Sequence, residues 1–575
     1  MARQTLAGLV CRVRENPTGI MKSETPIFRS GAAVPPTPFH SSAIRTRSAV
    51  AGMDRRAFLG LTAWGSAGAM LAWTPSVFGD PAAEDWDPNR PFRALGRPLK
   101  VQPMFMYALP TRKEQTSWRS WGGVQTESAV AEEVARISGE LKRMAAKAEF
   151  GLQVLPVAPV TSAEAADKLA AQDHDVTLVY ACTGSGALLR ACLGRKAHAL
   201  VFVRHRSGPV YYWYEALSTR HLQTDNPGPA TAADSGPLNV HVDDVVVDDP
   251  GELLWRLRAL FGVKNFLGTR IVALGGPWGK YAPDAPQKAQ ERFQLEIVDV
   301  SYETFGPRLR QARADRGLVV AAEKATARYL ALPKTKLLTD RQAVVNAFVL
   351  LRVIKDLMAE HDAVAFTIKS CMGTIIPMSE TTACLPLELL NDEGLIAFCE
   401  SDFVIIPAGL LLRYLAGKPV FLHNSTFPHE GMVTCAHCTS PRRLDGRKYA
   451  PAEIMTHYES DYGAAPKVAM PIGQQVTFID PEYSTTRWLG FKGVVKANPF
   501  YQICRSQQDV AIQGDWRKLR REARDSHWMM VYGDYLREIG CAARKLGLEW
   551  VNLSGSGNGV QEQANGVVAA PPLAV

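Results

Sequence analysis

The carboxyl-terminal half of the chain is organised around the stretch LIAFCESD at residues 395–402. This apolar run ends in two carboxylates, and an apolar helical segment at 403–415 and a second apolar run at 420–422 follow it. A strand, a helix and a second strand in this order are typical of a sheet covered by helices. Carboxylates at the end of such a strand suit cation binding or proton transfer. Capping of the following helix would explain Asp402 but not Glu400.

The same alternation of short apolar runs and helical stretches extends upstream to about residue 97. It predicts strands at 101–109, 152–157, 176–181, 199–203, 270–274, 295–300 and 363–368, and helices at 127–148, 252–261 and 340–360. Strands that alternate with helices form parallel sheets covered on both faces. We therefore expect an α/β protein with two doubly wound parallel-sheet domains and a C-terminal mixed α/β domain. The predicted boundaries are 80–237 for the N-terminal domain with a linker from residue 223, 238–370 for the second domain, and 371–575 for the domain that carries the site.

The first 79 residues have the features of a targeting segment. Residues 1–52 lack apolar periodicity, which predicts a disordered leader or a translation start placed upstream of a true start at Met53. Arg55 and Arg56 precede a short, weakly apolar run, so the segment 53–79 resembles a twin-arginine (Tat) export signal, although a buried N-terminal helix would have a similar pattern. We expect export to a periplasmic or other extracytoplasmic location.

Composition and charge narrow the possible partners. The chain has 575 residues, 46% hydrophobic and 21% charged, which is ordinary globular composition and excludes a mainly disordered or multispanning protein. The net charge is +8, but residues 1–52 alone hold seven basic and two acidic side chains. The rest is close to neutral, so nucleic acid is not expected as a partner. No segment is apolar enough to span a bilayer, so no stable membrane insertion is expected.

Several shorter motifs allow two structural or functional interpretations each. Residues 183–186, TGSG, follow a predicted strand and form either a phosphate-binding turn or a plain turn into a helix. The loop GGPWG at 275–279 either lines a ligand or only reverses the chain. Cys435 and Cys438 are half of a zinc site without a second pair, or a redox pair, and His437 between them suits the wall of a polar pocket. Glu459 lies in a polar stretch that faces a cavity or forms a solvated edge strand.

A second informative stretch is HWMMVYGDYL at residues 527–536. Its His527 begins an apolar run before an amphipathic helix, and taken alone it could be a structural histidine. Together with Glu400, Asp402, the helix end at Gly417 and the strand end FLHN at 421–424, it resembles the C-terminal region of the L-fucose isomerase and L-arabinose isomerase superfamily. The segment around His437 resembles the histidine-bearing turn of the arabinose isomerase branch.

This resemblance implies a metal-dependent aldose–ketose isomerase of the fucose isomerase type that acts through an enediol on a monosaccharide, as a homo-oligomer. It implies a divalent metal, Mn²⁺, held by Glu400, His527 and the residue at position 424, and proton transfer by a carboxylate. The family has a carboxylate where this chain has Asn424, which leaves the site one negative charge short. Either Asp402 or Glu459 compensates, or the chemistry has changed, or catalysis has been lost and the protein is an exported carbohydrate-binding protein with a degenerate site. For an active isomerase the expected catalytic residues are Glu400 and Asp402.

The same resemblance suggests which side chains contact the sugar. They lie beside the expected ligands in the sequence or in the polar stretches: His423, His437, Glu459 and Trp528.

Overall fold

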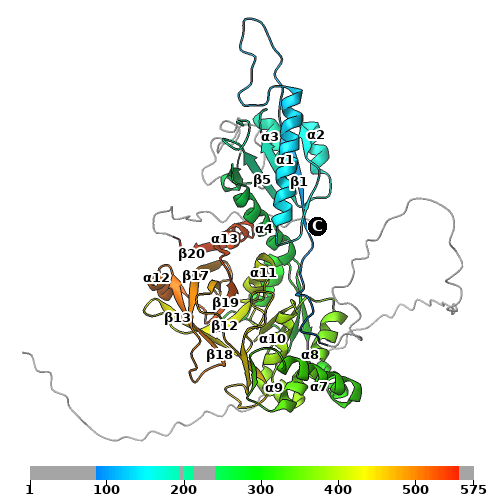
Figure 1. The fold of residues 1–575 in the computed structure, drawn as a ribbon, viewed down its shortest axis with the longest axis vertical. Coiled ribbons are helices and arrows are strands. Elements are labelled where there is room, and N and C mark those ends of the chain that lie inside the picture. The colour runs from blue at the N-terminus through cyan, green and yellow to red at the C-terminus, as the bar shows by residue number, and fades with distance from the viewer. Residues whose placement is uncertain (1–85, 195–197, 212–221, 223–239, 556–575) are drawn as a thin grey trace, which may run out of the picture. The chain divides into compact units, whose positions relative to one another are not determined.

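The computed structural model describes residues 86–194, 198–211, 222 and 240–555 (Figure 1). The expected leader at 1–52, the twin-arginine segment at 53–79 and the linker at 223–237 lie outside the described residues. None of the helices that the structure describes is both long and apolar enough to cross a membrane.

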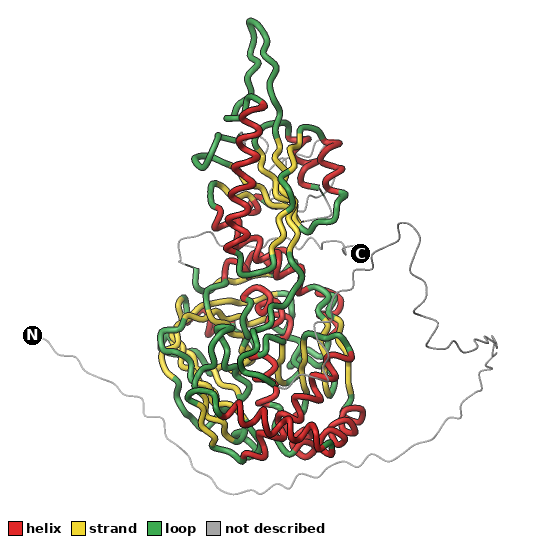
Figure 2. The backbone as a smooth tube through the Cα atoms, turned by 45° about the vertical axis from the view of Figure 1, so that its right-hand side comes forward, coloured by secondary structure: helices red, strands yellow, loops and turns green. Residues whose placement is uncertain are grey.

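The N-terminal part folds around a parallel sheet of six strands. Five lie in the order β2, β1, β4, β5, β6, and β3 also pairs with β1. The strands are β1 (Leu99–Met106), β2 (Leu152–Val154), β3 (Ala158–Val160), β4 (Val176–Ala181), β5 (His198–Val203) and β6 (Val245–Val247). Helices flank them (Figure 2): α1 (Glu127–Lys147), α2 (Ala163–Ala170), α3 (Gly186–Leu193) and α4 (Pro250–Phe266). All six residues of β4 are buried, as in a parallel sheet covered by helices.

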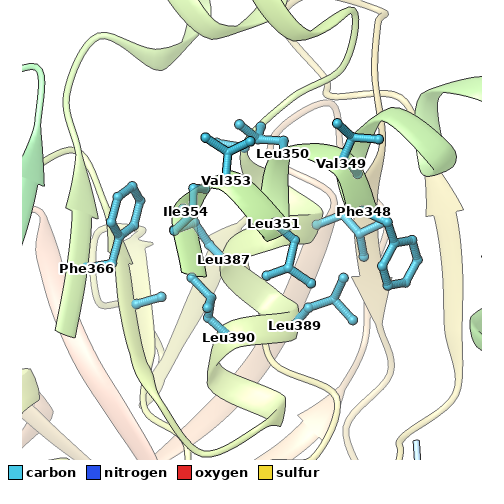
Figure 3. Close-up of a cluster of buried hydrophobic side chains, with 14 of the residues drawn as sticks. Phe348, Val349, Leu350, Leu351, Val353, Ile354, Phe366, Leu387, Leu389 and Leu390 are labelled. Atoms are coloured by element: carbon cyan, nitrogen blue, oxygen red, sulfur yellow. The ribbon is translucent and has the colours of Figure 1, made fainter. Parts of the chain in front are cut away.

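A second parallel sheet has four strands in the order β11, β10, β7, β8. They are β7 (Arg270–Leu274), β8 (Glu296–Val300), β10 (Ala365–Ile368) and β11 (Ile396–Cys399). The helices of this part are α5 (Ala285–Phe293), α6 (Tyr302–Ala314), α7 (Arg316–Leu330), α8 (Arg341–Glu360), α9 (Cys371–Ser379), α10 (Cys384–Asp392) and α11 (Ile406–Ala416). Figure 3 shows part of its core, where Phe348, Leu351 and Ile354 of α8 lie in one apolar cluster with Leu387 and Leu390 of α10.

The C-terminal part contains a closed antiparallel barrel of six strands. Its strands follow one another in the order β16, β19, β12, β13, β18, β17, and β17 closes the barrel by pairing with β16. They are β12 (Phe421–Ser425), β13 (Met432–His437), β16 (Gln475–Pro481), β17 (Arg487–Ala497), β18 (Ser506–Gln513) and β19 (His527–Tyr532). Strand β20 (Glu549–Asn552) pairs with β17 in parallel, and Figure 1 labels most of these strands in one group. Phe478, Phe491 and Trp528 contact one another in the barrel core.

The remaining elements are a one-turn 3-10 helix, η3 (Val242–Asp244), a small sheet and two further helices. Strands β9 (Thr335–Leu337), β14 (Ala452–Met455) and β15 (Ala465–Val468) form the sheet, and the helices are α12 (Trp516–Glu522) and α13 (Leu536–Lys545).

The prediction of parallel α/β sheets is confirmed, whereas the C-terminal part is more regular than predicted. Its strands are mostly antiparallel and close on themselves, where the sequence indicated only a mixed α/β arrangement.

The sheets also extend past the residues at which the domain boundaries were predicted. Strand β6 belongs to the first sheet although it follows residue 237, and β11 belongs to the second although it follows residue 370. The carboxylates after β11 therefore lie at the carboxyl edge of a parallel sheet, where ligands bind in α/β proteins.

Candidate metal centre

The turn after β11 carries Glu400 and Asp402 in a constrained backbone. Glu400 and Ser401 have φ angles of 70° and 51°, a left-handed conformation that is uncommon for residues other than glycine. Neighbouring segments hold it in place. The Ser401 amide donates to Thr367 Oγ1 of β10 at 3.1 Å, and the Trp278 indole, in the loop after β7, donates to the Glu400 carbonyl. Such strain persists only where the surrounding structure maintains it, which makes this turn a site candidate.

His527, the first residue of β19, lies against this turn. Its Nε2 atom is 3.0 Å from Glu400 Oε2, and its Nδ1 atom is 3.0 Å from Asp402 Oδ2. The imidazole is fully buried. Asp402 and His527 are 125 residues apart in the chain, so the contact exists only because the barrel meets the carboxyl edge of the second parallel sheet. The structure thus brings together Glu400 and His527, two of the three residues that the resemblance implied as metal ligands.

Asp402 is placed to orient His527. Its Oδ1 atom accepts hydrogen bonds from the amides of Lys280, at 3.0 Å, and Val404, at 3.1 Å, while Oδ2 contacts His527 Nδ1. The side chain is 0% exposed. Both oxygens are engaged and none faces solvent, so the geometry does not suit the catalytic proton transfer expected for Asp402. It suits the outer carboxylate of a carboxylate–histidine–metal arrangement, which fixes the ring and its tautomer.

Asn424 and His437 lie beside the same contact. Asn424 of β12 is directly opposite His527 in the antiparallel pairing, and residues opposite each other on neighbouring strands present their side chains on the same face. His437, the last residue of β13, has its Nε2 atom 3.5 Å from Glu400 Oε1. Its Nδ1 atom contacts the Thr439 hydroxyl at 2.9 Å, which orients the ring toward Glu400. Both predicted residues are therefore near the Glu400–His527 contact.

Three predicted sugar contacts lie elsewhere. His423 and Trp528 are opposite each other on β12 and β19, one residue along from Asn424 and His527, so they point to the other face and pack in the aromatic core of the barrel. Burial lowers the pKa of His423 to about 3, which keeps it neutral. Glu459 is an exposed residue in a turn. The barrel geometry gives His423 and Trp528 a packing role in place of the expected sugar contact.

In its contact with His527, Glu400 is ionised and partly exposed to solvent. Burial raises the pKa of Glu400, but contacts with His437 and His527 outweigh it and hold the pKa well below its usual range. Glu400 is 37% exposed, against 0% for Asp402, so it is the carboxylate of this pair that a ligand can reach. Ionised Glu400 is therefore the accessible anionic group of the cluster.

The donor atoms fit a divalent cation. Although His527 Nε2 is close to Glu400, it has no aligned hydrogen-bond partner, as expected when a nitrogen and an oxygen both point at a third atom. Glu400 and His527 offer a carboxylate oxygen and an imidazole nitrogen, and Asn424 lies on the same face of the strand pair; donors of these types occur at divalent metal sites. Another grouping among the described residues, Asp402, Asp525 and His527, has ligand atoms within 4.8 Å of one another. We favour the Glu400 side, because Asp402 and Asp525 are buried and already accept backbone hydrogen bonds.

The pH dependence of stability in metal-free protein tests this electrostatic arrangement. Burial lowers the pKa of His527, but its contacts with Asp402 and Glu400 raise it to about 9, above the value of about 6.5 in an unfolded chain. The ion pair therefore stabilises the fold fully below pH 6.5, and this contribution is lost as the pH rises through 9. We expect the melting temperature of metal-free protein to fall by several degrees across this range. His527→Gln is expected to flatten the profile, and an equal fall in that variant would contradict the assignment.

Sequence reasoning missed several residues of this cluster. Lys280 donates its amide to Asp402 and its Nζ to the Ser526 hydroxyl at 2.9 Å. It directly follows the GGPWG loop, but no local sequence pattern indicates that this loop meets residue 402. Asp525 accepts from the His527 amide at 3.2 Å. Its position two residues before His527 was the one signal that could have indicated it.

The cysteine motif and the 183–186 turn lie outside this cluster and have structural roles. Cys435 lies in the barrel core, whereas Cys438 packs with Cys384 in a separate cluster, so these two cysteines do not form the predicted half zinc site or redox pair. Residues 183–186 form the turn into α3, whose N-cap is Ser185. This turn lines a cavity of ≈ 750 Å³ beside the first sheet, and none of the residues around Glu400 contributes to its wall.

No protein-family model matches this chain, and no curated protein matches its sequence.

Proposed function

We propose that this protein is a metal-dependent sugar isomerase that interconverts an aldose and a ketose through an enediol. The observation that carries the proposal is the convergence of Glu400 Oε2 and His527 Nε2, 3.0 Å apart, with Asp402 behind the imidazole. Asn424 lies opposite His527, at the position where the fucose isomerase superfamily has a second carboxylate ligand. We propose in addition that the parallel sheets and the barrel are arranged as in that superfamily, as a homo-oligomer exported by the Tat route.

In this proposal Glu400, His527 and the Asn424 carbonyl hold a divalent cation, most simply Mn²⁺. A cation held there would increase the acidity of the proton on the carbon next to the sugar carbonyl. The protein's own contribution is to present Glu400 in the ionised state, which can take up that proton and return it to the neighbouring carbon. Asp402 holds a proton on Nδ1 of His527, so that the proton a cation would displace is the one on Nε2. His437 lies on the other oxygen of Glu400 and can orient a sugar hydroxyl there.

The neutral side chain of Asn424 leads to a prediction about the affinity for Mn²⁺. We expect Asn424→Asp to tighten Mn²⁺ binding about tenfold, which is about 1.4 kcal/mol. This expected gain in binding free energy is smaller than the attraction of roughly 4 kcal/mol between two opposite unit charges 4 Å apart at an effective dielectric constant of about 20. Isothermal titration measures the change. His429→Asp adds the same charge at an exposed position of the next loop and serves as control. Unchanged affinity in Asn424→Asp would show that residue 424 does not contact the metal.

The same amide favours a second candidate, an exported carbohydrate-binding protein. Asn424 cannot transfer a proton, and of the carboxylates near His527 only Glu400 is substantially exposed. Solvent deuterium exchange separates the two functions, because an enediol path exchanges the hydrogen at C2 even when net conversion is slow. We expect metal-dependent incorporation into at least one sugar from a panel of deoxyhexoses, pentoses and uncommon hexoses. Binding to several of these sugars without exchange into any would favour the binding protein.

A further inference from the structure

Two cysteines lie together at the carboxyl edge of the second parallel sheet. Cys399 is the last residue of β11 and directly precedes Glu400, and its strand partner in β10 is Ile368. Cys371 follows three residues after Ile368, as the first residue of α9. The two thiols are in hydrogen-bond contact, and Cys371 packs against the core cluster that contains Cys399. Both are free thiols.

The surroundings of Cys371 favour the thiolate. The hydrogen bond from Cys399 lowers the pKa of Cys371, and the backbone amides of Cys371 and Met372 at the start of α9 act in the same direction; together they outweigh burial and the negative charge of Glu400, which raise it. Cys371 is half-buried and therefore reachable by a small molecule, whereas Cys399 is 8% exposed. A reachable thiol of lowered pKa beside a second thiol is the arrangement found at redox-sensitive cysteines.

We propose that Cys371 and Cys399 form a redox-sensitive pair that a hydroperoxide converts into a disulfide next to Glu400. The Cys371 thiolate attacks one peroxide oxygen, the O–O bond breaks, and Cys371 becomes a sulfenic acid while hydroxide leaves and is protonated to water. The Cys399 sulfur then attacks the Cys371 sulfur. The S–O bond breaks and a second water leaves with the Cys399 proton. Two thiols lose two electrons, which reduce the peroxide. The inference does not rest on the proposed isomerase function.

The chain offers a matched internal control at Cys504. This residue is also half-buried, and its thiol also contacts a buried thiol, that of Cys438. Here, however, the hydrogen bond to Cys438 and burial both raise the pKa of Cys504 far above its usual range. The two pairs differ mainly in how readily the outer thiol ionises. Since the thiolate is the nucleophile, Cys371 should react with peroxide much faster than Cys504.

The test uses the full wild-type chain. The protein is treated at pH 7 with one equivalent of hydrogen peroxide, remaining thiols are blocked with N-ethylmaleimide at timed intervals, and peptides are quantified by mass spectrometry. We expect Cys371 to lose its free thiol at least about tenfold faster than Cys504, since one pKa unit changes the thiolate fraction tenfold. A peptide that links Cys371 to Cys399 should appear at the same rate and disappear on reduction with dithiothreitol.

Variants test the role of Cys371 as the thiol that peroxide oxidises first and the role of Cys399 as the thiol that completes the disulfide. In Cys399→Ser the reaction should stop at the sulfenic acid, which dimedone traps on Cys371, and in Cys504→Ser the Cys371–Cys399 link should form as in wild type. Equal rates at Cys371 and Cys504, or oxidation that yields no such link, would overturn the proposal. The comparison of rates within wild-type protein decides the question even if Cys399→Ser does not fold.

Discussion

Glu400→Gln is expected to abolish metal-dependent deuterium exchange into the substrate, with a loss of at least about a hundredfold, as for other carboxylates that carry a proton. The glutamine keeps an oxygen at the Oε2 position but has no charge, so it can neither take up the proton nor bind a cation firmly. It also removes the partner that raises the pKa of His527. Because Glu400 is the exposed carboxylate of the cluster, neither Asp402 nor Asp525 can replace it.

The exchange is measured by proton NMR as loss of the C2 signal in deuterated buffer, with and without Mn²⁺. Glu459→Gln removes a carboxylate from an exposed turn of the same part of the chain and is expected to leave the exchange rate unchanged. Full exchange in Glu400→Gln, or its loss in Glu459→Gln, would assign the proton transfer to another residue.

Asp402→Asn is expected to weaken metal binding by about 10- to 100-fold while the fold is kept. The asparagine oxygen can still accept from the Lys280 and Val404 amides, but its NH₂ group then faces His527 Nδ1. That nitrogen must become an acceptor, so the ring proton moves to Nε2 and blocks the ligand position. The circular dichroism spectrum is expected to be unchanged, whereas the melting temperature of metal-free protein falls by several degrees, because Asp402 is one of the two carboxylates that stabilise charged His527.

Asp525→Asn is the matched comparison for this prediction. Asp525 accepts from the His527 amide, lies near Asp402, and has its pKa raised by burial, so its amide counterpart keeps the acceptor and loses little. We expect metal affinity within a fewfold of wild type. If Asp525→Asn loses the metal while Glu400→Gln retains it, the cation lies on the Nδ1 side of His527, among Asp402 and Asp525.

Local patterns predicted the parallel sheets well, because each strand and helix there is encoded by a short contiguous segment. Strand β7 has the predicted bounds, and helix α8 begins one residue later than predicted. The barrel could not be predicted in the same way. Strand β17 is buried on both faces over much of its length, so it shows no simple alternation. The pairing of β12 with β19 is also not a property of either segment alone.

The same difference between local and long-range information applies to the candidate site. Glu400 and His527 were predicted as ligands because the strand ends that carry them resemble those of the fucose isomerase superfamily in order and spacing; neither position alone indicated a metal. The orienting role of Asp402 depends on partners from two distant segments, the amide of Lys280 and the ring of His527, which only the folded chain brings together. The inward orientation of His423 and Trp528 follows from the register between β12 and β19, and a shift of one residue would have exchanged them with Asn424 and His527.

The closure of the barrel sets the order in which the site is assembled during synthesis. A ribosome adds about 5–20 residues per second, and the parallel sheets can fold as soon as their segments have emerged. Strand β12 must then wait for β19, about a hundred residues later, before it has its neighbour on that side. Until residue 527 is made, Glu400 lacks the imidazole of His527 on its Oε2 side, and only His437 can lie beside its other oxygen. A nascent or truncated chain that ends before β19 can therefore hold folded sheets and still lack the Glu400–His527 contact, so that binding of the proposed metal would have to follow the synthesis of β19.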